Sequence, residues 1–191
     1  MKKLIAFVMV IVMMSVLVAC GGSTETQPTA PEMAAPGRAL EILENIWGKY
    51  ADEEKFPLMG GNVESGIMDA PGNYDMAYAE NLSYNLLVPA DRITDVTEAA
   101  SMIHMMNANT FTCGVLRLAE GTDAASFAAA MEQAVQNNQW MCGFPETLVI
   151  GTIGAEYVLV AFGLNDTMTP FQTHLAAAYP GAEILYNEAI G

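Results

Sequence analysis

Four neighbouring residues, Met102, His104, Met105 and Met106, carry side chains that could bind a soft metal ion. Thioether sulfur and imidazole nitrogen are donors that suit Cu(I). Methionine also fills irregular gaps in hydrophobic cores, and adjacent side chains mostly point in different directions. The pattern therefore leaves two interpretations, a copper site and ordinary core packing. We favour core packing because it does not require the four side chains to converge on one point.

Cys113 and Cys142 are predicted to form a disulfide bond. Cys113 lies early in a predicted strand, 110–118, and the chain then turns back along a predicted helix, 123–138, which is followed by Cys142. A strand of nine residues advances ~30 Å and a helix of about 16 residues returns ~24 Å, so the second cysteine would come near the first. The alternative is a pair of free thiols buried as small hydrophobic side chains.

No set of residues identifies a catalytic mechanism. The Gly-x-Ser-x-Gly motif of one class of hydrolases is absent. His174 has no acidic residue three or four positions away, which suggests a surface or partly packed side chain. The acidic run 52–54 (Asp-Glu-Glu) is expected to be solvated, with weak Ca²⁺ contact as the alternative. We therefore do not expect an enzyme, and a hydrolase is the least favoured of the functions considered.

Cys20 points to a different chemistry, the attachment of lipid. Residues 1–3 form a short positive segment, and residues 4–18 are apolar except for Ser15. This run is shorter than the ~20 residues of a membrane-spanning helix and is typical of a signal peptide. Leu17-Val18-Ala19-Cys20 then resembles the lipobox of bacterial lipoproteins, in which the cysteine thiol receives diacylglycerol. A chance cysteine after an ordinary secretory signal is the alternative.

Three regions follow from this interpretation. Residues 1–19 are predicted to be a lipoprotein signal peptide. Residues 20–37 comprise the lipidated Cys20 and a flexible tether, since Gly, Ser, Thr, Gln and Pro dominate this stretch. Residues 38–191 remain for a single globular domain, which is long enough to bury a core without metal ions or many disulfides.

The charge of the chain excludes one class of partner. The formal net charge is −15, and removal of Lys2 and Lys3 with the signal leaves five basic residues against 22 acidic ones, a net charge of −17. A polyanionic protein without a basic patch repels nucleic acid. It also repels anionic lipid headgroups, so membrane attachment is expected to depend on the lipid on Cys20 alone.

Several elements are predicted from periodicity. Residues 39–50 place apolar side chains three and four positions apart, which indicates an amphipathic helix. Residues 110–118 are expected to form a strand, and Asp123 is expected to cap the helix 123–138. Residues 148–153 and 156–162 form a predicted hairpin with a two-residue turn, Gly154-Ala155. A helix over 169–179 and a short strand over 183–186 complete the domain.

Other segments are less well defined by their sequence. Residues 57–73 are expected to be a loop with one short strand, because Gly and Pro punctuate them. Residues 74–87 suit a helix or a strand, and we favour the helix. Asp95 and Glu98 have the spacing of a capping box that opens a helix reaching Met106, although the end of this segment equally suits a strand.

These elements predict an α+β fold. The expected sheet is mixed or antiparallel, with helices packed mainly on one face, and it contains a strand-helix-hairpin-helix unit.

Residues from about 82 to 163 resemble a family of small lipoproteins of anaerobic Gram-positive bacteria whose domain has no assigned function. The resemblance is carried by Pro89-Ala90-Asp91, by Met105-Met106-Asn107, and by the order of the strand 110–118, the helix from Asp123 and the hairpin ending at Phe162. The lipobox start agrees with it. The resemblance implies a lipoprotein and this fold class, and it supplies no catalytic residues.

The sequence therefore predicts a lipoprotein of unknown function on the extracytoplasmic face of a bacterial cell membrane. We expect a non-catalytic module that binds a partner protein, an envelope component or a small ligand and that needs no cofactor. The alternative is a copper-binding lipoprotein that uses the Met/His group, and a hydrolase ranks below both.

Overall fold

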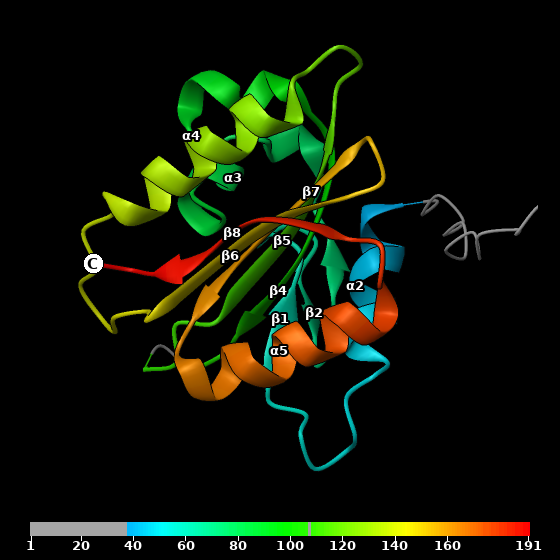
Figure 1. Ribbon diagram of the computed structural model, residues 1–191, viewed down its shortest axis with the longest axis vertical. Coiled ribbons are helices and arrows are strands. Elements are labelled where there is room, and N and C mark those ends of the chain that lie inside the picture. Colours follow the sequence, from blue (N-terminus) through cyan, green and yellow to red (C-terminus); the bar gives the residue numbers. More distant parts are fainter. Residues whose placement is uncertain (1–37, 107) are drawn as a thin grey trace, which may run out of the picture. The chain divides into compact units, whose positions relative to one another are not determined.

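The computed structural model describes residues 38–106 and 108–191 (Figure 1). The predicted signal peptide, Cys20 and the tether lie outside the described residues, as does Asn107. The elements, in chain order, are α2 (Ala39–Trp47), β1 (Leu58–Gly60), β2 (Ile67–Met68), β3 (Gly72–Asn73), the 3-10 turn η1 (Met76–Tyr78), α3 (Asn81–Asn85), the 3-10 turn η2 (Ala90–Asp95), β4 (Val96–His104), β5 (Thr112–Leu118), α4 (Ala124–Gln136), β6 (Thr147–Ile153), β7 (Tyr157–Gly163), α5 (Asn165–Ala178) and β8 (Glu183–Ala189).

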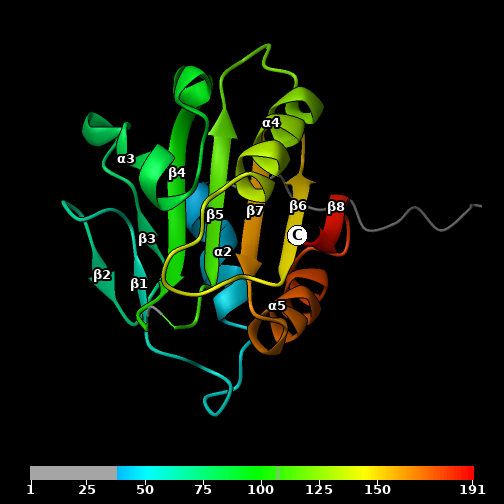
Figure 2. The ribbon, with the colours of Figure 1, turned by 90° about the vertical axis from the view of Figure 1, so that its left-hand side faces the viewer.

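The eight strands form one antiparallel sheet, so the fold is α+β as predicted. Seven strands follow the order β2-β1-β4-β5-β7-β6-β8, and β3 pairs with β4 beside β1. Figure 2 views the central strands face-on, with the long pairings of β4, β5, β7 and β6 side by side. β4, β5 and β7 are flanked by strands on both sides, and the charged residues lie mainly outside them.

Helices cover both faces of the sheet, and the prediction of helices mainly on one face is wrong. Figure 1 shows α3 and α4 on one side of the sheet and α2 and α5 on the other. Two connections explain this arrangement. α4 links β5 to β6, α5 links β7 to β8, and each connection skips one strand in the same direction across the sheet. Because β5 and β7 are antiparallel, two crossovers of the same hand must place their helices on opposite faces.

Each face has its own hydrophobic core. The core under α2 and α5 contains Ile42, Leu43, Phe111 and Phe171 among its fully buried side chains. The core under α3 and α4 contains Leu82, Leu86, Phe127 and Met131. Burial of both faces accounts for the nearly continuous apolar runs of β5, β6 and β7, which a sheet with one solvated face would not show.

The helix predicted from Asp95 to Met106 is wrong, because this segment forms the central strand β4. The two residues of the proposed capping box have other partners. Asp95 pairs with Arg92, and the Glu98 carboxylate accepts a hydrogen bond from the Ala39 backbone N–H at 3.1 Å. β4 gains ladder hydrogen bonds from β5 on one side and from β1 and β3 on the other. Tertiary pairing therefore overrides the local helix signal.

Residues 57–88 contain more strand and less helix than predicted. Three short strands form there, and the helix expected over 74–87 is reduced to η1 and the five residues of α3. The segment folds around the buried Asn62, whose side-chain oxygen accepts hydrogen bonds from Ser65 and from the Asp75 backbone N–H. Such hydrogen bonds from side chain to backbone compete with helix formation.

Other predicted elements agree in position and differ at their ends. The helices predicted over 39–50 and 123–138 and the strand over 110–118 are confirmed. Ile153 pairs with Tyr157, so the hairpin loop has three residues where two were expected, and Gly154 supplies the positive φ of 65°. α5 begins at Asn165, four residues before the expected start, since the Glu146 carboxylate accepts a hydrogen bond from the Asn165 backbone N–H.

Candidate functional site

The four residues of the candidate copper site differ sharply in their accessibility. Met102 is fully buried in the core under α2 and α5, whereas Met105 and Met106 are 44% and 61% exposed beyond the end of β4. His104 lies between these environments and stacks on Phe56 with the ring centroids 5.0 Å apart. Met102 therefore serves as a core side chain, which agrees with the favoured interpretation of the sequence pattern.

The hydrogen bonding of His104 also disfavours a metal site. Its Nδ1 accepts a hydrogen bond from the Met106 backbone N–H at 3.0 Å. A neutral imidazole that accepts at Nδ1 carries its proton on Nε2, so neither nitrogen offers a free lone pair. Desolvation lowers the pKa of His104 below 6.5, which favours this neutral form.

Cys113 and Cys142 are both free thiols in the structure, so the predicted disulfide is not formed there. Side chains alternate along a strand, and that of Cys113 points into the core under α2 and α5. Cys142 is exposed in the loop that follows α4, on the opposite face of the sheet. The topological prediction brought the loop back along the strand but did not fix which face the cysteine side chain occupies.

His174 is a partly packed side chain, which is one of the two states predicted from the sequence. Its ring lies 4.1 Å from that of Tyr50, and its Nε2 is 3.3 Å from a Glu54 carboxylate oxygen. Asp52 is exposed and pairs with Lys55, so the acidic run is largely a solvated face. Among residues 38–106 and 108–191, no three His, Cys, Asp or Glu side chains gather closely enough to hold a metal ion.

The structure draws several predicted residues together at a pocket that we call the sheet-end groove. It lies where β4 ends and β5 begins, and it has a volume of about 340 Å³. Phe162 of β7 and three segments line it: residues 84–87 at the end of α3, residues 103–104 with 109–112, and residues 138–143 after α4. His104 and Cys142 both belong to this lining. Figure 2 shows the loop after α4, in yellow, crossing this end of the sheet.

The groove is uncharged although the protein is strongly acidic. Neither Asp, Glu, Lys nor Arg occurs among the described residues that line it. Its polar groups include the amides of Asn85, Asn109 and Asn138 and the hydroxyls of Thr110 and Thr112. A surface of this kind suits an uncharged ligand, because a buried charge without a partner is costly.

Exposed apolar side chains line the groove or directly follow its lining residues in the chain. Tyr84 and Met141, which line it, are 80% and 89% exposed. Phe144 follows the lining residues of the last segment and is 68% exposed, and Met105 and Met106 directly follow the lining residue His104. These five account for half of the ten large hydrophobic side chains that are exposed in the described chain. Such clustering marks an interaction surface.

Two buried polar atoms in the lining residues have no hydrogen-bond partner among the described residues, Trp140 Nε1 and Thr110 Oγ1. Buried polar groups are nearly always paired, and an unpaired one carries a free-energy cost of about 1–3 kcal/mol. The Trp140 ring packs on Phe162 with centroids 5.3 Å apart. Both atoms would gain a partner if a ligand with hydrogen-bonding groups entered the groove and displaced the side chains that cover them.

The walls of the groove are held in place from several directions. The Asn109 side chain donates to Thr167 Oγ1 at 2.9 Å and accepts from the Phe111 backbone N–H at 3.0 Å, which ties this wall to α5. Leu87 has a positive φ of 58°, a backbone conformation that is strained for a bulky residue. Backbone strain of this kind is found at ligand sites, where the surrounding structure enforces it.

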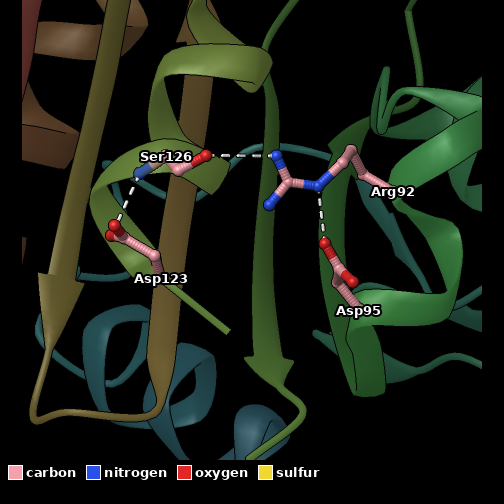
Figure 3. A network of polar contacts seen from close by, with 4 residues as sticks. All are labelled: Arg92, Asp95, Asp123 and Ser126. Atoms are coloured by element: carbon pink, nitrogen blue, oxygen red, sulfur yellow. Dashed lines mark hydrogen bonds and ion pairs between the residues drawn. The ribbon is translucent and has the colours of Figure 1, made fainter. Parts of the chain in front are cut away.

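The helix that carries the last groove segment is anchored at its other end by a polar network (Figure 3). The Asp123 carboxylate caps α4 by accepting hydrogen bonds from the backbone N–H groups of Ala125 and Ser126. The Arg92 guanidinium pairs with Asp95 and donates to Ser126 Oγ at 3.5 Å. η2 and α4 are thereby linked, and the start of α4 is fixed relative to β4.

Two other hollows lack this combination of features. The pocket between α5 and β8, with a volume of about 240 Å³, is mainly apolar. The pocket at the opposite end of β5, with a volume of about 570 Å³, contains the ion pair between Arg117 and Glu156. The sheet-end groove alone among these three is lined by three amide side chains and by two apolar or aromatic side chains, Tyr84 and Met141, that are at least 80% exposed.

Sequence reasoning identified His104 and Cys142 but missed Tyr84, Trp140 and Met141. The available signal was the apolar character of residues 140–144, Trp-Met-Cys-Gly-Phe, within a loop between a helix and a strand. Loops generally consist of polar residues with turn-forming tendencies, so a run of large apolar residues in one indicates either burial or binding.

No family model, curated protein or solved structure matches this chain. The resemblance to small lipoproteins stays a prediction. None of the helices in the described residues has both the length and the apolar character needed to cross a membrane.

Proposed function

We propose that this protein is a lipoprotein, anchored through Cys20 on the extracytoplasmic face of a bacterial membrane, whose folded domain binds a partner through the sheet-end groove. The anchor rests on the signal and lipobox pattern of residues 1–20. The binding role rests on one observation, the gathering of half of the exposed large hydrophobic side chains around an uncharged pocket. Binding without catalysis fits a groove whose lining provides one neutral histidine and one exposed thiol as its reactive groups.

The scaffold of this site is the strand-helix-hairpin-helix unit predicted from the sequence. In this proposal β5, α4, the β6–β7 hairpin and α5 act as one unit. Its strands supply Thr112 and Phe162, the loop after α4 supplies the exposed rim, and α5 holds Asn109 through Thr167. Sites built on strands and braced by a second element keep their shape when a ligand binds.

Labelling of Cys142 in intact cells tests both the location and the binding role. Cys113 is buried, and burial raises the pKa of its thiol, so a membrane-impermeant maleimide should modify Cys142 and leave Cys113 untouched. An extracytoplasmic domain is labelled in intact cells. A domain labelled only after lysis would contradict the proposed location.

The rate of the same reaction reports on occupancy of the groove. We expect Cys142 to react more slowly in cells than in purified protein, because the bound partner covers it. Tyr84→Ser should remove this protection. Val63→Ser is the matched control, since Val63 is 81% exposed, nearly the same as Tyr84, and does not line the groove. Equal rates in cells and in purified protein would contradict the binding role.

A further inference from the structure

We propose that the sheet-end groove binds a short apolar segment of a partner polypeptide, flanked on that partner by basic residues. This inference rests on the proposed function and specifies the ligand. It is carried by three properties of the site: the composition of its rim, the hydrogen-bonding groups of its lining, and the charge of the domain around it.

The rim has the composition of a protein-binding surface. Three of its five exposed apolar side chains are methionines, Met105, Met106 and Met141, and the others are Tyr84 and Phe144. Methionine and aromatic residues are enriched in the cores of protein interfaces, from which Lys, Glu and Asp are depleted. Flexible methionine side chains also adapt to apolar groups of varied shape. A carbohydrate would place its hydroxyl groups against these apolar side chains, and those hydroxyl groups would then lack hydrogen-bond partners.

The lining offers hydrogen-bonding groups that suit a polypeptide backbone. Amide side chains such as that of Asn138 present both a donor and an acceptor, which match the C=O and N–H of a peptide unit. Trp140 Nε1, a donor, and Thr110 Oγ1, which can donate or accept, are buried and lack partners among the described residues, so a peptide that displaces the groups covering them can bind both. A peptide in the groove would satisfy these groups without introducing a charge.

The negative charge of the domain favours a peptide whose apolar segment is flanked by basic residues. Residues 38–191 contain five basic residues and 20 acidic ones, and none of the basic residues lines the groove. Four of the five basic side chains pair with acidic ones, Arg38 with Glu98, Lys55 with Asp52, Arg92 with Asp95 and Arg117 with Glu156. The unbalanced field is therefore negative and steers a positively charged partner toward the domain.

Protection of Cys142 by defined peptides tests this inference. The full-length protein in lipid nanodiscs is treated with the maleimide in the presence of a peptide mixture whose short core is randomised among Leu, Ile, Val, Phe and Met between lysine pairs. We expect modification of Cys142 to slow by about tenfold at saturation. Tyr84→Ser should reduce the affinity by about tenfold, as expected for loss of one aromatic contact, and Val63→Ser should leave it unchanged.

Three further probes test separately whether charge, apolar contact or an uncharged glycan accounts for the binding. Peptides with Ser/Gly cores between lysine pairs test charge alone, and peptides with the apolar cores between glutamate pairs test apolar contact alone; both should protect Cys142 less than the first mixture. Equal protection by either set would overturn the inference. N-acetylglucosamine trimer represents an uncharged glycan, and protection by it but not by the peptides would overturn the inference while leaving the proposed function intact. If Cys142 is shielded in cells but none of the probes protects it, the peptide inference is wrong and the proposed binding function stands. If Cys142 is not shielded in cells and none of the probes protects it, both the inference and the proposed binding function are wrong.

Discussion

At the scale of single residues, the groove combines several local features that are unfavourable for stability. His104 is held neutral, Leu87 has a strained backbone, and Trp140 and Thr110 each contain a buried polar atom without a partner among the described residues. Proteins concentrate such features at sites that bind, where the surrounding structure holds them in place. Two of these features can be tested by their effects on stability.

We expect His104 to make stability depend on pH. Burial lowers its pKa in the folded protein below the ordinary value of 6.5. As the pH falls below 6.5, the unfolded chain therefore takes up a proton more readily than the folded one, and stability is lost until the pH reaches the folded pKa. His104→Asn, which keeps an acceptor for the Met106 N–H, should remove this part of the pH dependence. Urea unfolding of both proteins above and below pH 6.5 measures it, and an unchanged difference would show that His104 is not responsible.

At position 87 we expect glycine to give a more stable protein than alanine, which is the reverse of the usual order. Leu87 has a φ of 58°, which is accessible to glycine without strain but is unfavourable for any residue with a Cβ. Leu87→Gly should therefore be more stable than Leu87→Ala by about 1 kcal/mol, although glycine normally destabilises a chain relative to alanine. Thermal unfolding of the two variants gives the comparison. If Leu87→Ala is the more stable, the left-handed conformation is absent in solution.

At the scale of elements, the short strands β1 and β3 approach each other so closely at Gly60 and Gly72 that a side chain is excluded at either position. A Cβ added to Gly60 would lie 2.0 Å from the Gly72 backbone nitrogen, and one added to Gly72 would lie 2.6 Å from the Gly60 carbonyl carbon. Backbone atoms cannot move aside as the end of a flexible side chain can. This close approach accompanies the pairing of both strands with β4, in which Leu58 of β1 pairs with the groove residue His104.

Gly60→Ala should consequently be among the most damaging single substitutions in the protein. We expect a loss of about 3 kcal/mol or more, because the sheet edge must rearrange to admit the methyl group. Gly121→Ala is the matched control. Gly121 has a positive φ of 85° but open space around its Cβ position, so it should lose only about 1 kcal/mol. Denaturant unfolding measures both, and similar losses would mean that the close approach relaxes easily.

At the scale of the whole molecule, strong acidity and lipid attachment have opposite effects on association with a membrane. The net charge of −17 that would follow removal of the proposed signal would repel anionic lipids. Two acyl chains give durable binding that this repulsion does not overcome, whereas one chain binds only marginally. Membrane association in our proposal thus depends entirely on the modification of Cys20.

Cys20→Ala should abolish membrane attachment of the processed form. We expect the variant either to be released as a soluble protein or to remain unprocessed, since no other anchor is proposed. Cell fractionation with mass analysis of the N-terminal peptide distinguishes these forms, and the wild type should show a diacylglyceryl group on Cys20. A wild-type protein that is soluble and retains Lys2 and Lys3 would end the lipoprotein proposal. Cys142→Ala is the control and should stay membrane-bound.

The sequence alone determined the elements whose patterns are local. The helices at 39–47 and 124–136, the strand at 112–118 and the hairpin formed by β6 and β7 follow from apolar spacing, a capping aspartate and a glycine turn. The α+β class, with a sheet that was either mixed or antiparallel, followed from their order. These features depend on neighbours within a few residues, which a sequence displays directly.

Tertiary structure decided everything that depends on partners distant in the sequence. Val96–His104 became a strand because β5, β1 and β3 supply its hydrogen bonds, and Asp95 and Glu98 found partners other than a helix terminus. Helices covered both faces because two crossovers start from antiparallel strands. The groove joins residues from positions 84 to 162, and Cys113 and Cys142 were separated by the alternation of side chains on β5. Spacing along a chain gives no measure of which face a side chain occupies, and that choice follows from the sheet as a whole.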